Sequence, residues 1–294
     1  MNNNPLVSMM LFTYNQSEFV AEAINGALSQ IYSPLEIIIS DDCSSDNTFA
    51  IITDMVNQYQ GEHTIIVNQN SINVGASEHV NHVVQRASGE LLIFAAGDDV
   101  SLSHRVSTIV ERWINSGSVA FFSNLNRMNS DSQLLGNIYS TYPVFAERIT
   151  DILLGKPCWT IGASFSCEKR VFNAFDRIPK TVLQEDGCIA FRCLLLGNIE
   201  YVNQPLVNYR FHEGSVSQHF DAQKRLVLQK SEYYMHASNL QDAILLLGEE
   251  HDISKYLWRK IFFFRFRHHL LRLPFWGLIY NKIRIVLARK LKGV

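Results

Sequence analysis

Apolar segments alternate with amphipathic segments through the first hundred residues of the chain. Four short segments consist almost entirely of apolar residues, which is typical of strands buried on both faces of a parallel sheet. The segments between them carry apolar residues at spacings of three and four, which predicts helices. The predicted strands are residues 6–13, 35–40, 64–68 and 90–96, and the predicted helices are residues 17–30, 47–59 and 76–86. This alternation predicts an α/β fold with a mostly parallel sheet, right-handed connections and helices on both faces.

Small polar residues precede two of the predicted helices. Ser17 is the expected N-cap of the first helix, and Ser45 or Asp46 is the expected N-cap of the second. Their side-chain oxygens can accept a hydrogen bond from an N–H group of the first helical turn. Pro34 prevents the first helix from continuing into the second strand.

Beyond residue 100 the pattern is less regular and the predicted elements are shorter. Residues 124–160 are rich in Asn, Ser and Tyr, and we expect strands and loops there. The predicted helices are residues 106–114, 171–175, 184–196 and 221–248, and the predicted strands are residues 119–123, 199–202 and 206–210. We therefore divide the chain into a domain of residues 1–220, with halves 1–100 and 101–220, and a helical C-terminal region of residues 221–294.

Two pairs of adjacent aspartates directly follow apolar segments of the predicted sheet. Asp41–Asp42 follows residues 35–40, and Asp98–Asp99 follows residues 90–96. Open α/β sheets bind ligands at the carboxyl ends of their strands, so we expect four carboxylates at one edge. Such an edge repels a bare phosphate unless a divalent cation is added. Mg²⁺ and Mn²⁺ prefer oxygen ligands and commonly share them with substrate phosphates. Solvated loop carboxylates or helix caps are the alternative explanation.

Several common classes of protein are disfavoured by the motifs that the sequence lacks. The chain has neither G-x-G-x-x-G after its first strand nor a G-x-x-x-x-G-K-[ST] motif, so no glycine-rich loop is expected to hold phosphates. The five cysteines are odd in number and have no C-x-x-C spacing, which favours reduced thiols over disulfides or zinc. The N-terminus shows no secretory signal, and we expect no membrane-spanning helix.

The first hundred residues resemble a family 2 glycosyltransferase with the GT-A fold. An ordered set of motifs carries the similarity, and no single motif is specific. These motifs are L-F-T-Y-N-Q-S-E-F-V at residues 11–20, A-L-S-Q-I-Y at 27–32, E-I-I-I-S-D-D-C-S-S-D-N-T at 36–48, N-V-G-A-S-E-H-V-N at 73–81, G-E-L-L-I-F at 89–94 and G-D-D at 97–99. The resemblance continues more weakly through Y-R-F-H-E-G-S-V-S at residues 209–217.

The resemblance implies a donor site at the predicted sheet edge. In that family the first acidic pair holds the nucleobase, and an Asp-x-Asp motif binds the ribose and the metal on the diphosphate. Ala96 stands where the first Asp of that motif usually stands, which leaves Asp98 as the expected ligand of Mn²⁺ or Mg²⁺, with Asp99 beside it. His212 would complete the metal shell, or Arg210 would bind the diphosphate; a structural histidine is the alternative. The residues expected to contact the nucleotide are Thr13, Tyr14, Asn15, Asp41, Asp42, Asn73, Gly75, Asp98 and Arg210.

The resemblance also implies an acidic catalytic pair at the start of the helix predicted for residues 184–196. Asp186 is expected to take the proton from the acceptor hydroxyl, with Glu185 as the second candidate. The alternative is that both acids only favour the positive end of the helix dipole. Trp159 and Gly162 are expected to line the acceptor side, and a core position is the alternative for Trp159.

Charge is distributed unevenly along the chain. The net charge is −2, yet no Asp or Glu follows Asp252, and 11 of the 26 Lys and Arg residues lie in residues 255–292. This tail is also rich in aromatic residues, and Pro274 is expected to divide it into two helices. We predict that it binds an anionic membrane surface, and packing on the acidic body is the alternative. Nucleic-acid binding is disfavoured because the acidic body would repel it.

These observations predict an inverting, metal-dependent glycosyltransferase that uses a nucleotide-sugar donor, most simply a UDP-sugar. The resemblance implies a bacterial enzyme of surface polysaccharide synthesis, such as O-antigen or capsule, so the expected acceptor is a saccharide or polyprenyl-linked saccharide. We expect a cytoplasmic protein, peripheral on the inner face of the membrane, and the sequence is compatible with a homo-oligomer. One alternative is a sugar nucleotidyltransferase, which the missing Gly-rich, Arg- and Lys-containing N-terminal loop disfavours. A non-catalytic saccharide-binding protein is the other, and Ala96 favours it.

Overall fold

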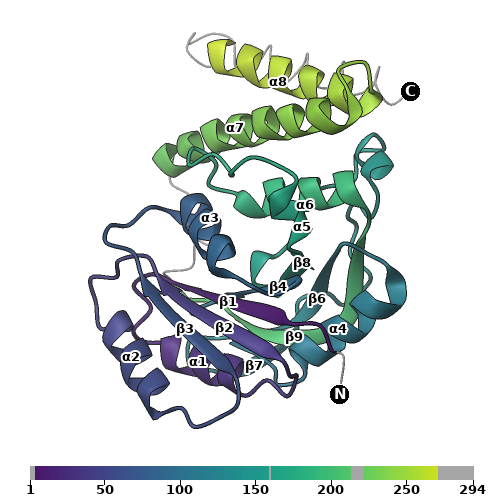
Figure 1. The fold of residues 1–294 in the computed structure, drawn as a ribbon. Helices are drawn as coiled ribbons and strands as arrows, with labels where there is room; N and C mark the ends of the chain where they lie inside the picture. Colours follow the sequence, from purple (N-terminus) through teal and green to yellow (C-terminus); the bar gives the residue numbers. More distant parts are fainter. Residues whose placement is uncertain (1–3, 159, 213–221, 271–294) are drawn as a thin grey trace.

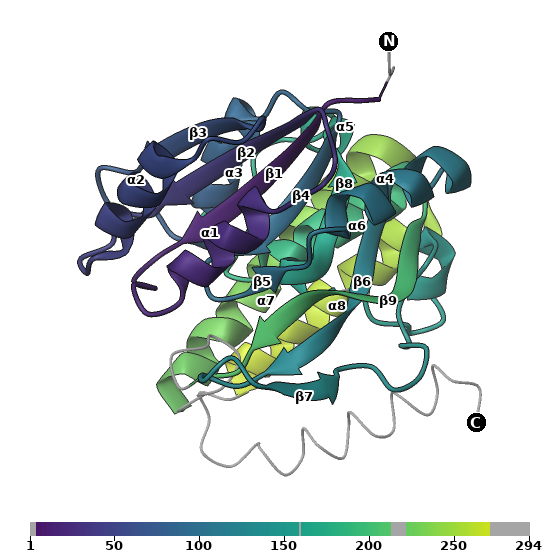
Figure 2. The same cartoon turned by 90° about the horizontal axis from the view of Figure 1, so that it is seen from below.

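A curled sheet with helices on both of its faces forms the body of the protein (Figures 1 and 2). The computed structural model describes residues 4–158, 160–212 and 222–270. The strands are β1 (Val7–Thr13), β2 (Leu35–Asp41), β3 (Thr64–Gln69), β4 (Leu91–Ala96), β5 (Val100–Ser101), β6 (Ala120–Met128), β7 (Leu134–Asn137), β8 (Phe165–Glu168) and β9 (Ile199–Arg210). The helices are α1 (Val20–Leu28), α2 (Thr48–Gln58), α3 (Ala76–Arg86), α4 (Arg105–Ser116), α5 (Arg170–Asn173), α6 (Glu185–Leu196), α7 (Ala222–Leu247) and α8 (Asp252–Leu270), with short 3-10 helices η1 (Ile149–Ile152) and η2 (Gly162–Ser164).

The strands of the sheet follow the order β3-β2-β1-β4-β8-β6-β9-β5, and β7 pairs with β6 outside this path. β3, β2, β1 and β4 are mutually parallel, which confirms the predicted βαβ half. β8 runs antiparallel to both β4 and β6, and β9 runs parallel to β6 and antiparallel to β5. The sheet is therefore mixed. The short strands β5 and β8 were not predicted, because segments of two and four residues carry almost no periodicity.

The strands β1, β2 and β4 are buried because each of them contributes to two hydrophobic clusters. Met9 and Leu11 of β1 belong to one cluster with Ile24 of α1, whereas Met10 belongs to the other cluster with Val83 of α3. Successive side chains of a strand point to opposite faces of the sheet, so both faces of β1 are covered. This arrangement explains why the strand segments read as continuous apolar runs rather than alternating patterns.

Three local predictions were wrong. Ser17 is not the N-cap of α1, whose N-cap residue is Phe19; the N–H of Ser17 donates to Asp46 instead. Asn47 occupies the N-cap position of α2, although Asp46 accepts a hydrogen bond from the N–H of Thr48, as a capping side chain does. The strands predicted for residues 199–202 and 206–210 form the single strand β9, which pairs with β6 on both sides of an irregularity at residues 203–204.

The helix α7 packs on α6, and α8 packs along α7 (Figure 1). Ile253, Leu257 and Ile261 on α8 are buried in the same hydrophobic cluster as the core residues of α6. A buried ion pair between Arg192 Nε and Asp242 Oδ2, 2.8 Å apart, joins α6 to α7. Across the described residues, each helix is too short or too polar to span a bilayer. The break predicted at Pro274 lies outside the described residues.

Candidate active site

The strand order places the two aspartate pairs at the same edge of the sheet, on either side of β1. Thr13 of β1 pairs with Asp41 of β2, and Phe12 of β1 pairs with Ala96 of β4. The three strands are parallel, so their carboxyl ends meet at the edge where such sheets bind ligands. Because β1 lies between them, β2 and β4 are about 10 Å apart. The turns that carry the two acidic pairs therefore lie at the same edge of the sheet, on either side of β1.

Asp41 is fully buried at the end of β2, and the ends of three neighbouring segments donate to its carboxylate. Thr13 Oγ1 donates to Oδ1 at 3.1 Å, and Gln69 Nε2 donates to Oδ2 at 3.2 Å. The N–H and the hydroxyl of Ser44 also donate to this carboxylate, at 2.9 and 2.5 Å. Asp41 therefore holds together the carboxyl ends of β1, β2 and β3.

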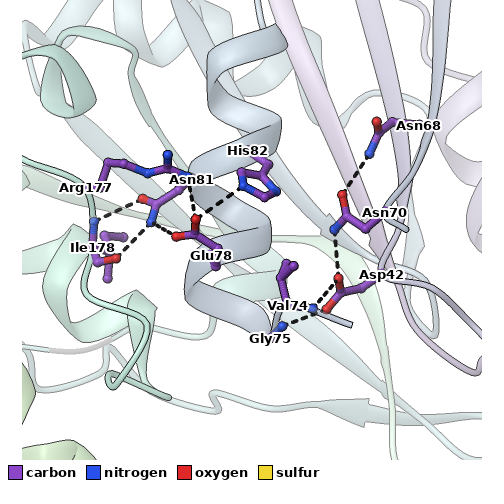
Figure 3. Close-up of polar contacts among 10 residues, drawn as sticks. All are labelled: Asp42, Asn68, Asn70, Val74, Gly75, Glu78, Asn81, His82, Arg177 and Ile178. Carbon is purple, nitrogen blue, oxygen red and sulfur yellow. Dashed lines mark hydrogen bonds and ion pairs between the residues drawn. The ribbon is translucent and has the colours of Figure 1, made fainter. Parts of the chain in front are cut away.

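Asp42 is also buried, and it fixes the start of α3 (Figure 3). The N–H groups of Val74 and Gly75 donate to its two carboxylate oxygens at 3.0 and 2.9 Å, and Asn70 Nδ2 donates at 2.8 Å. Gly75 has φ +83°, a conformation that L side chains rarely adopt, which explains the glycine before this helix. A carboxylate is stable at a helix N-terminus because free N–H groups and the helix dipole both favour negative charge there.

Two loops that follow β1 and β2 are joined through Asn15. The N–H of Asn15 donates to Ser44 Oγ at 2.8 Å, and the N–H of Ser45 donates to Asn15 Oδ1 at 2.8 Å. Tyr14 beside it is 47% exposed. This junction leaves the Tyr14 ring open to solvent at the edge where a nucleotide is expected.

Gly97 allows the loop after β4 to lie directly against the loop after β1. A Cβ atom at this position would lie 2.4 Å from Gln16 Oε1 and 2.7 Å from Thr13 Cγ2, too close for either contact. The N–H of Gly97 donates to the carbonyl of Phe12 at 2.9 Å. The glycine of the G-D-D motif therefore has a packing role, which sets the position of the two following aspartates.

The side chains of Asp98 and His212 face each other. Asp98 Oδ2 and His212 Nε2 are 3.0 Å apart, and the two side chains are 19% and 16% exposed. β5 begins directly after Asp99 and pairs antiparallel with β9, where Val100 lies opposite Asn208. This pairing brings residues 208–212 back to the acidic pair from more than a hundred positions away in the sequence. The ring of His212 also packs on Phe19, with centroids 4.7 Å apart.

Asp99 is buried and holds the end of β9. Its Oδ1 accepts the N–H of Arg210 at 2.8 Å. Burial raises the pKa of Asp99 well above its usual value, and the negative charge of Asp98 acts in the same direction. Arg105 is fully buried nearby, and burial lowers the pKa of its guanidinium to about 9 although Asp99 opposes this change. Asp99 thus lies behind Asp98 in the interior of the protein.

Arg210 directs its guanidinium toward protein groups. Nε donates to the carbonyl of Asp98 at 2.9 Å, and Nη2 forms an ion pair with Glu22 at 3.0 Å. Nη1 donates to Ser132 Oγ at 2.9 Å, and the guanidinium carbon lies 4.6 Å from the centre of the Phe19 ring. The side chain is fully buried. The structure therefore places Arg210 beneath the Asp98 turn, where it joins β9 to α1.

Glu185 and Asp186 open α6, as predicted, and both are partly exposed. Burial raises the pKa of Glu185 to about 7, and the negative charge of Asp186 adds to this shift. Burial also raises the pKa of Asp186, although the N–H of Gly187 donates to its Oδ1 at 2.8 Å. A carboxylate with a raised pKa is a stronger base, so this pair is suited to accept a proton near neutral pH.

Gly162 lies next to this acidic pair. A Cβ atom on Gly162 would lie 4.0 Å from the Cβ of Asp186. Gly162 begins η2, which packs against β4, so the segment connects the acidic helix with the sheet that carries Asp98. Trp159, the other residue expected on the acceptor side, lies outside the described residues. Asn73, expected on the nucleotide side, is exposed in the loop before α3.

Sequence reasoning missed several polar residues that hold the predicted ones. Gln69 ends β3 and contacts Asp41, and Asn70 directly after it contacts Asp42. Their position at the end of a third parallel strand is a signal that could have found them. Glu22 pairs with Arg210 from the first turn of α1, and its position in the sequence carries no comparable signal.

Sequence comparison assigns the chain to a family of enzymes. The sequence model of Glycosyl transferase family 2 matches residues 8–170, which is more than half of the chain. The chain therefore belongs to glycosyl transferase family 2, as the motifs at residues 11–99 predicted.

Bacterial proteins named as glycosyltransferases are similar to between about a third and three quarters of the chain. "Uncharacterized glycosyltransferase alr2836" of Nostoc is 27% identical over 70% of this chain and 65% of that protein. "Putative glycosyltransferase EpsE" of Bacillus subtilis is 34% identical over 36% of this chain and 37% of that protein. The chain thus spans less than two thirds of the length of these relatives. The Escherichia coli protein named "UDP-Glc:alpha-D-GlcNAc-diphosphoundecaprenol beta-1,3-glucosyltransferase WfaP" is 28% identical over 72% of this chain and 80% of that protein.

Solved structures share the fold. The structure of residues 1–349 of Staphylococcus aureus TarS in complex with UDP-GlcNAc matches with a TM-score of 0.66 and 15% identity, over 89% of this chain and 72% of that chain. The mannosyltransferase PcManGT of Pyrobaculum calidifontis, in complex with GDP-Man and Mn²⁺, matches with a TM-score of 0.58 and 14% identity, over 99% of this chain and 83% of that chain. The GT-A fold expected from the sequence is therefore confirmed.

Proposed function

We propose that the protein transfers a sugar from a UDP-sugar to a hydroxyl of a lipid-linked saccharide, with inversion at the anomeric carbon. One observation carries this proposal: the strand order gathers Asp41, Asp42 and Asp98 at a single ligand-binding edge, and the β5–β9 pairing adds His212 there. Membership of glycosyl transferase family 2 supports the reaction class.

The names of the relatives support the choice of substrates. The Escherichia coli relative is named as acting on UDP-Glc and a GlcNAc-diphosphoundecaprenol acceptor with a β-1,3 product. A Campylobacter jejuni relative, 32% identical over 120 residues, is named as a β-1,3-glucosyltransferase acting on an undecaprenol-linked glycan. A "Putative teichuronic acid biosynthesis glycosyltransferase" of Bacillus subtilis is 27% identical over 219 residues. We place this chain in the same kind of pathway, the synthesis of a bacterial surface polysaccharide.

Asp98 and His212 fit a divalent cation. A carboxylate oxygen and an imidazole nitrogen converge at 3.0 Å, and Mn²⁺ accepts both kinds of ligand. Within the ranges that the structure describes, no cluster of three or more His, Cys, Asp or Glu side chains is arranged to hold a metal. The donor diphosphate and water would therefore complete the coordination, as is common for Mg²⁺ and Mn²⁺. When bound, such an ion would stabilise the negative charge that develops on the leaving diphosphate.

The residues of the chain bind the nucleobase, position the site and accept the proton. Asp41 and Asp42 shape the pocket for the nucleobase, and Thr13, Tyr14, Asn15, Asn73 and Gly75 line its edge. Asp99 and Arg210 have a supporting role, because their side chains hold the Asp98 turn and the end of β9 in place. Asp186 takes the proton of the attacking hydroxyl, with Glu185 as the second candidate, and the acceptor enters beside Gly162. Such a single displacement requires no covalent nucleophile.

A product assay tests the proposal and its rivals together. The full chain is incubated with Mn²⁺, UDP-glucose and an undecaprenyl-diphosphate-linked GlcNAc analogue, and free UDP and glycosylated lipid are measured. Equal amounts of UDP and product are expected. Formation of pyrophosphate from UTP and a sugar 1-phosphate would instead identify a nucleotidyltransferase. Binding of UDP-sugars without transfer or hydrolysis, across a panel of donors, would identify a saccharide-binding protein.

We also propose that α8 lies on an anionic membrane surface. The inward face of α8 is apolar and buried, whereas its outward face carries Trp258 and Phe262, which are 54% and 66% exposed. Lys255 and Arg259 are exposed on the same face, one turn apart, and no acidic residue follows Asp252. Aromatic side chains flanked by cations are typical of helices that bind at the lipid interface. The location suits an enzyme whose acceptor is anchored in lipid.

Vesicle sedimentation tests this surface. We expect the chain to bind vesicles that contain phosphatidylglycerol and to bind pure phosphatidylcholine weakly. The double variant Trp258→Ala/Phe262→Ala is expected to lose at least fivefold in vesicle affinity, whereas Leu245→Ala, which removes an exposed apolar residue of α7, serves as the control. Truncation before α8 is unsuitable because it would remove Leu257 and Ile261 from the core. Equal binding of the double variant and the wild type contradicts the assignment.

A further inference from the structure

The helix α3 connects the two halves of the candidate active site. Its first turn is bound to the sheet edge, where Asp42 accepts the N–H groups of Val74 and Gly75. Its buried face contacts residues 177–184, the segment that leads directly into the acidic pair at the start of α6 (Figure 3). These two connections join parts of the chain that lie about a hundred residues apart in sequence.

Asn81 is the central contact between α3 and this segment. It is 5% exposed, and its amide forms two hydrogen bonds with the backbone of one residue. Asn81 Nδ2 donates to the carbonyl of Ile178 at 2.8 Å, and the N–H of Ile178 donates to Asn81 Oδ1 at 3.0 Å. One turn earlier, Ser77 Oγ donates to the carbonyl of Val182 at 2.5 Å. The Asn81 side chain thus pairs with the segment as a neighbouring strand would.

These bonds matter because the backbone of Ile178 is buried. The side chain of Ile178 is 1% exposed, so its N–H and carbonyl have little access to water as replacement partners. A buried backbone group without a partner is costly, and a segment that loses such bonds moves until it finds others. At the outer surface, Arg177 pairs with Glu78 at 2.7 Å, but Arg177 is half exposed and such pairs contribute little. Asn81 therefore contributes more to the position of the segment than the visible ion pair does.

Besides its hydrogen bonds to α3, the segment is held by Ile178 and Val182, which are buried in the hydrophobic core, and by contacts near its end. The N–H of Leu183 donates to Ser231 Oγ of α7 at 2.6 Å, and Gln184 is the N-cap residue of α6. We infer that Asn81 is a positioning residue for Glu185 and Asp186: it fixes the segment 177–184 on α3 and so sets the distance between the proton acceptor and the donor edge. This inference rests on the proposed transferase function.

Kinetics of Asn81→Ala test the inference. We expect kcat to fall at least tenfold, while the affinity for UDP with Mn²⁺ stays within twofold of wild type, because Asn81 itself lies away from the donor. The rising limb of kcat against pH should also move to lower pH. Loosening the segment admits water to Asp186, the proposed base, and to Glu185, and the burial that raises the pKa of both carboxyl groups is then reduced. Gln85→Ala, an exposed amide one turn along α3, is the matched control and should match wild type.

Hydrogen exchange provides a readout that does not depend on activity. Residues 177–184 should exchange faster in Asn81→Ala than in wild type, whereas β1 should be unchanged. Wild-type kcat with unchanged exchange in Asn81→Ala overturns the inference. An equal loss of kcat and donor binding with an unshifted pH profile also overturns it, because that result indicates general destabilisation. Should Asn81→Ala fail to fold, Ser77→Ala removes a single bond of the same contact and is judged by the same criteria. An inactive wild type would refute the proposed function, while the exchange data would still decide whether Asn81 holds the segment.

Discussion

The acidic pair after β2 and the acidic pair at the start of α6 occupy contrasting environments. Asp41 and Asp42, at the donor edge, are buried, yet their oxygens accept hydrogen bonds from backbone N–H groups, hydroxyls and side-chain amides. Glu185 and Asp186, at the start of α6, are more exposed, yet burial of their carboxyl groups raises the pKa of both. Hydrogen-bond donors, rather than exposure alone, distinguish the two sites.

The difference shows how one fold separates binding from proton transfer. A carboxylate whose lone pairs are already occupied by N–H groups is a rigid structural element, and it is suited to shape a pocket. A carboxylate with few donors around it holds a proton more tightly and is suited to general base chemistry. The structure therefore favours a holding role for the pair after β2 and a chemical role for the pair at α6.

The largest effect should follow a change of the proposed base. Asp186→Asn preserves the shape of the side chain and removes its basicity, so kcat is expected to fall by about 10³-fold. The affinity for UDP should be unchanged, because Asp186 belongs to the acceptor side. Asp176→Asn, an exposed aspartate ten residues earlier, is the control. A near-wild-type rate for Asp186→Asn would assign the base elsewhere, and Glu185→Gln is then the next variant to measure.

A change at Asp98 should show how much of the UDP affinity depends on the metal ion. Asp98→Ala is expected to weaken UDP binding in Mn²⁺ by about 100-fold, since a metal ligand and its orientation by His212 are both lost. In EDTA the variant and the wild type should bind equally. Isothermal titration with Asp54→Ala as an exposed control measures both conditions. Wild-type affinity that is insensitive to EDTA would contradict the assignment of Asp98.

A smaller effect is expected on stability, and its sign follows from the raised pKa of Glu185. The pKa is about 7 in the folded protein against 4.5 without the protein environment, so the folded state holds this proton more tightly. The contribution of Glu185 is fully present below pH 4.5 and is lost as pH rises to 7. The free energy of unfolding of Glu185→Gln minus that of wild type should therefore be about 1–3 kcal/mol larger at pH 8 than at pH 4.5. Urea unfolding at the two pH values measures this, and a constant difference would show that Glu185 is not desolvated.

The sequence predicted the regular part of the fold well. The parallel strands around β1 read as uninterrupted apolar runs, and the helices between them have clear periodicity, so both were recognised. The mixed half was predicted less completely. β5 and β8 are too short to leave a pattern, and the continuity of β9 depends on its pairing with β6 rather than on its own residues.

The candidate site was predicted in a similarly uneven way. Asp98 and His212 were proposed together because of a family resemblance, and the structure brings them to 3.0 Å. Arg210 was expected to contact the diphosphate, whereas the structure buries its guanidinium against Glu22 and the Asp98 carbonyl. Asn81 was not singled out at all, since an asparagine within a helix usually faces solvent. Its importance appears only when its partner, 97 residues away, is known.

The sequence by itself determined the four parallel strands of the first half of the sheet and that acidic residues follow or end two of them. Local periodicity and strand-end position are encoded in neighbouring residues, and neighbouring residues are all that such reasoning uses. Only the tertiary structure decided that β1 lies between the two pairs, that β9 returns His212 to Asp98, and that α3 holds the segment before Asp186. Those relations depend on the pairing of strands and the packing of helices across long stretches of chain, where the burial of backbone polar groups selects the partners.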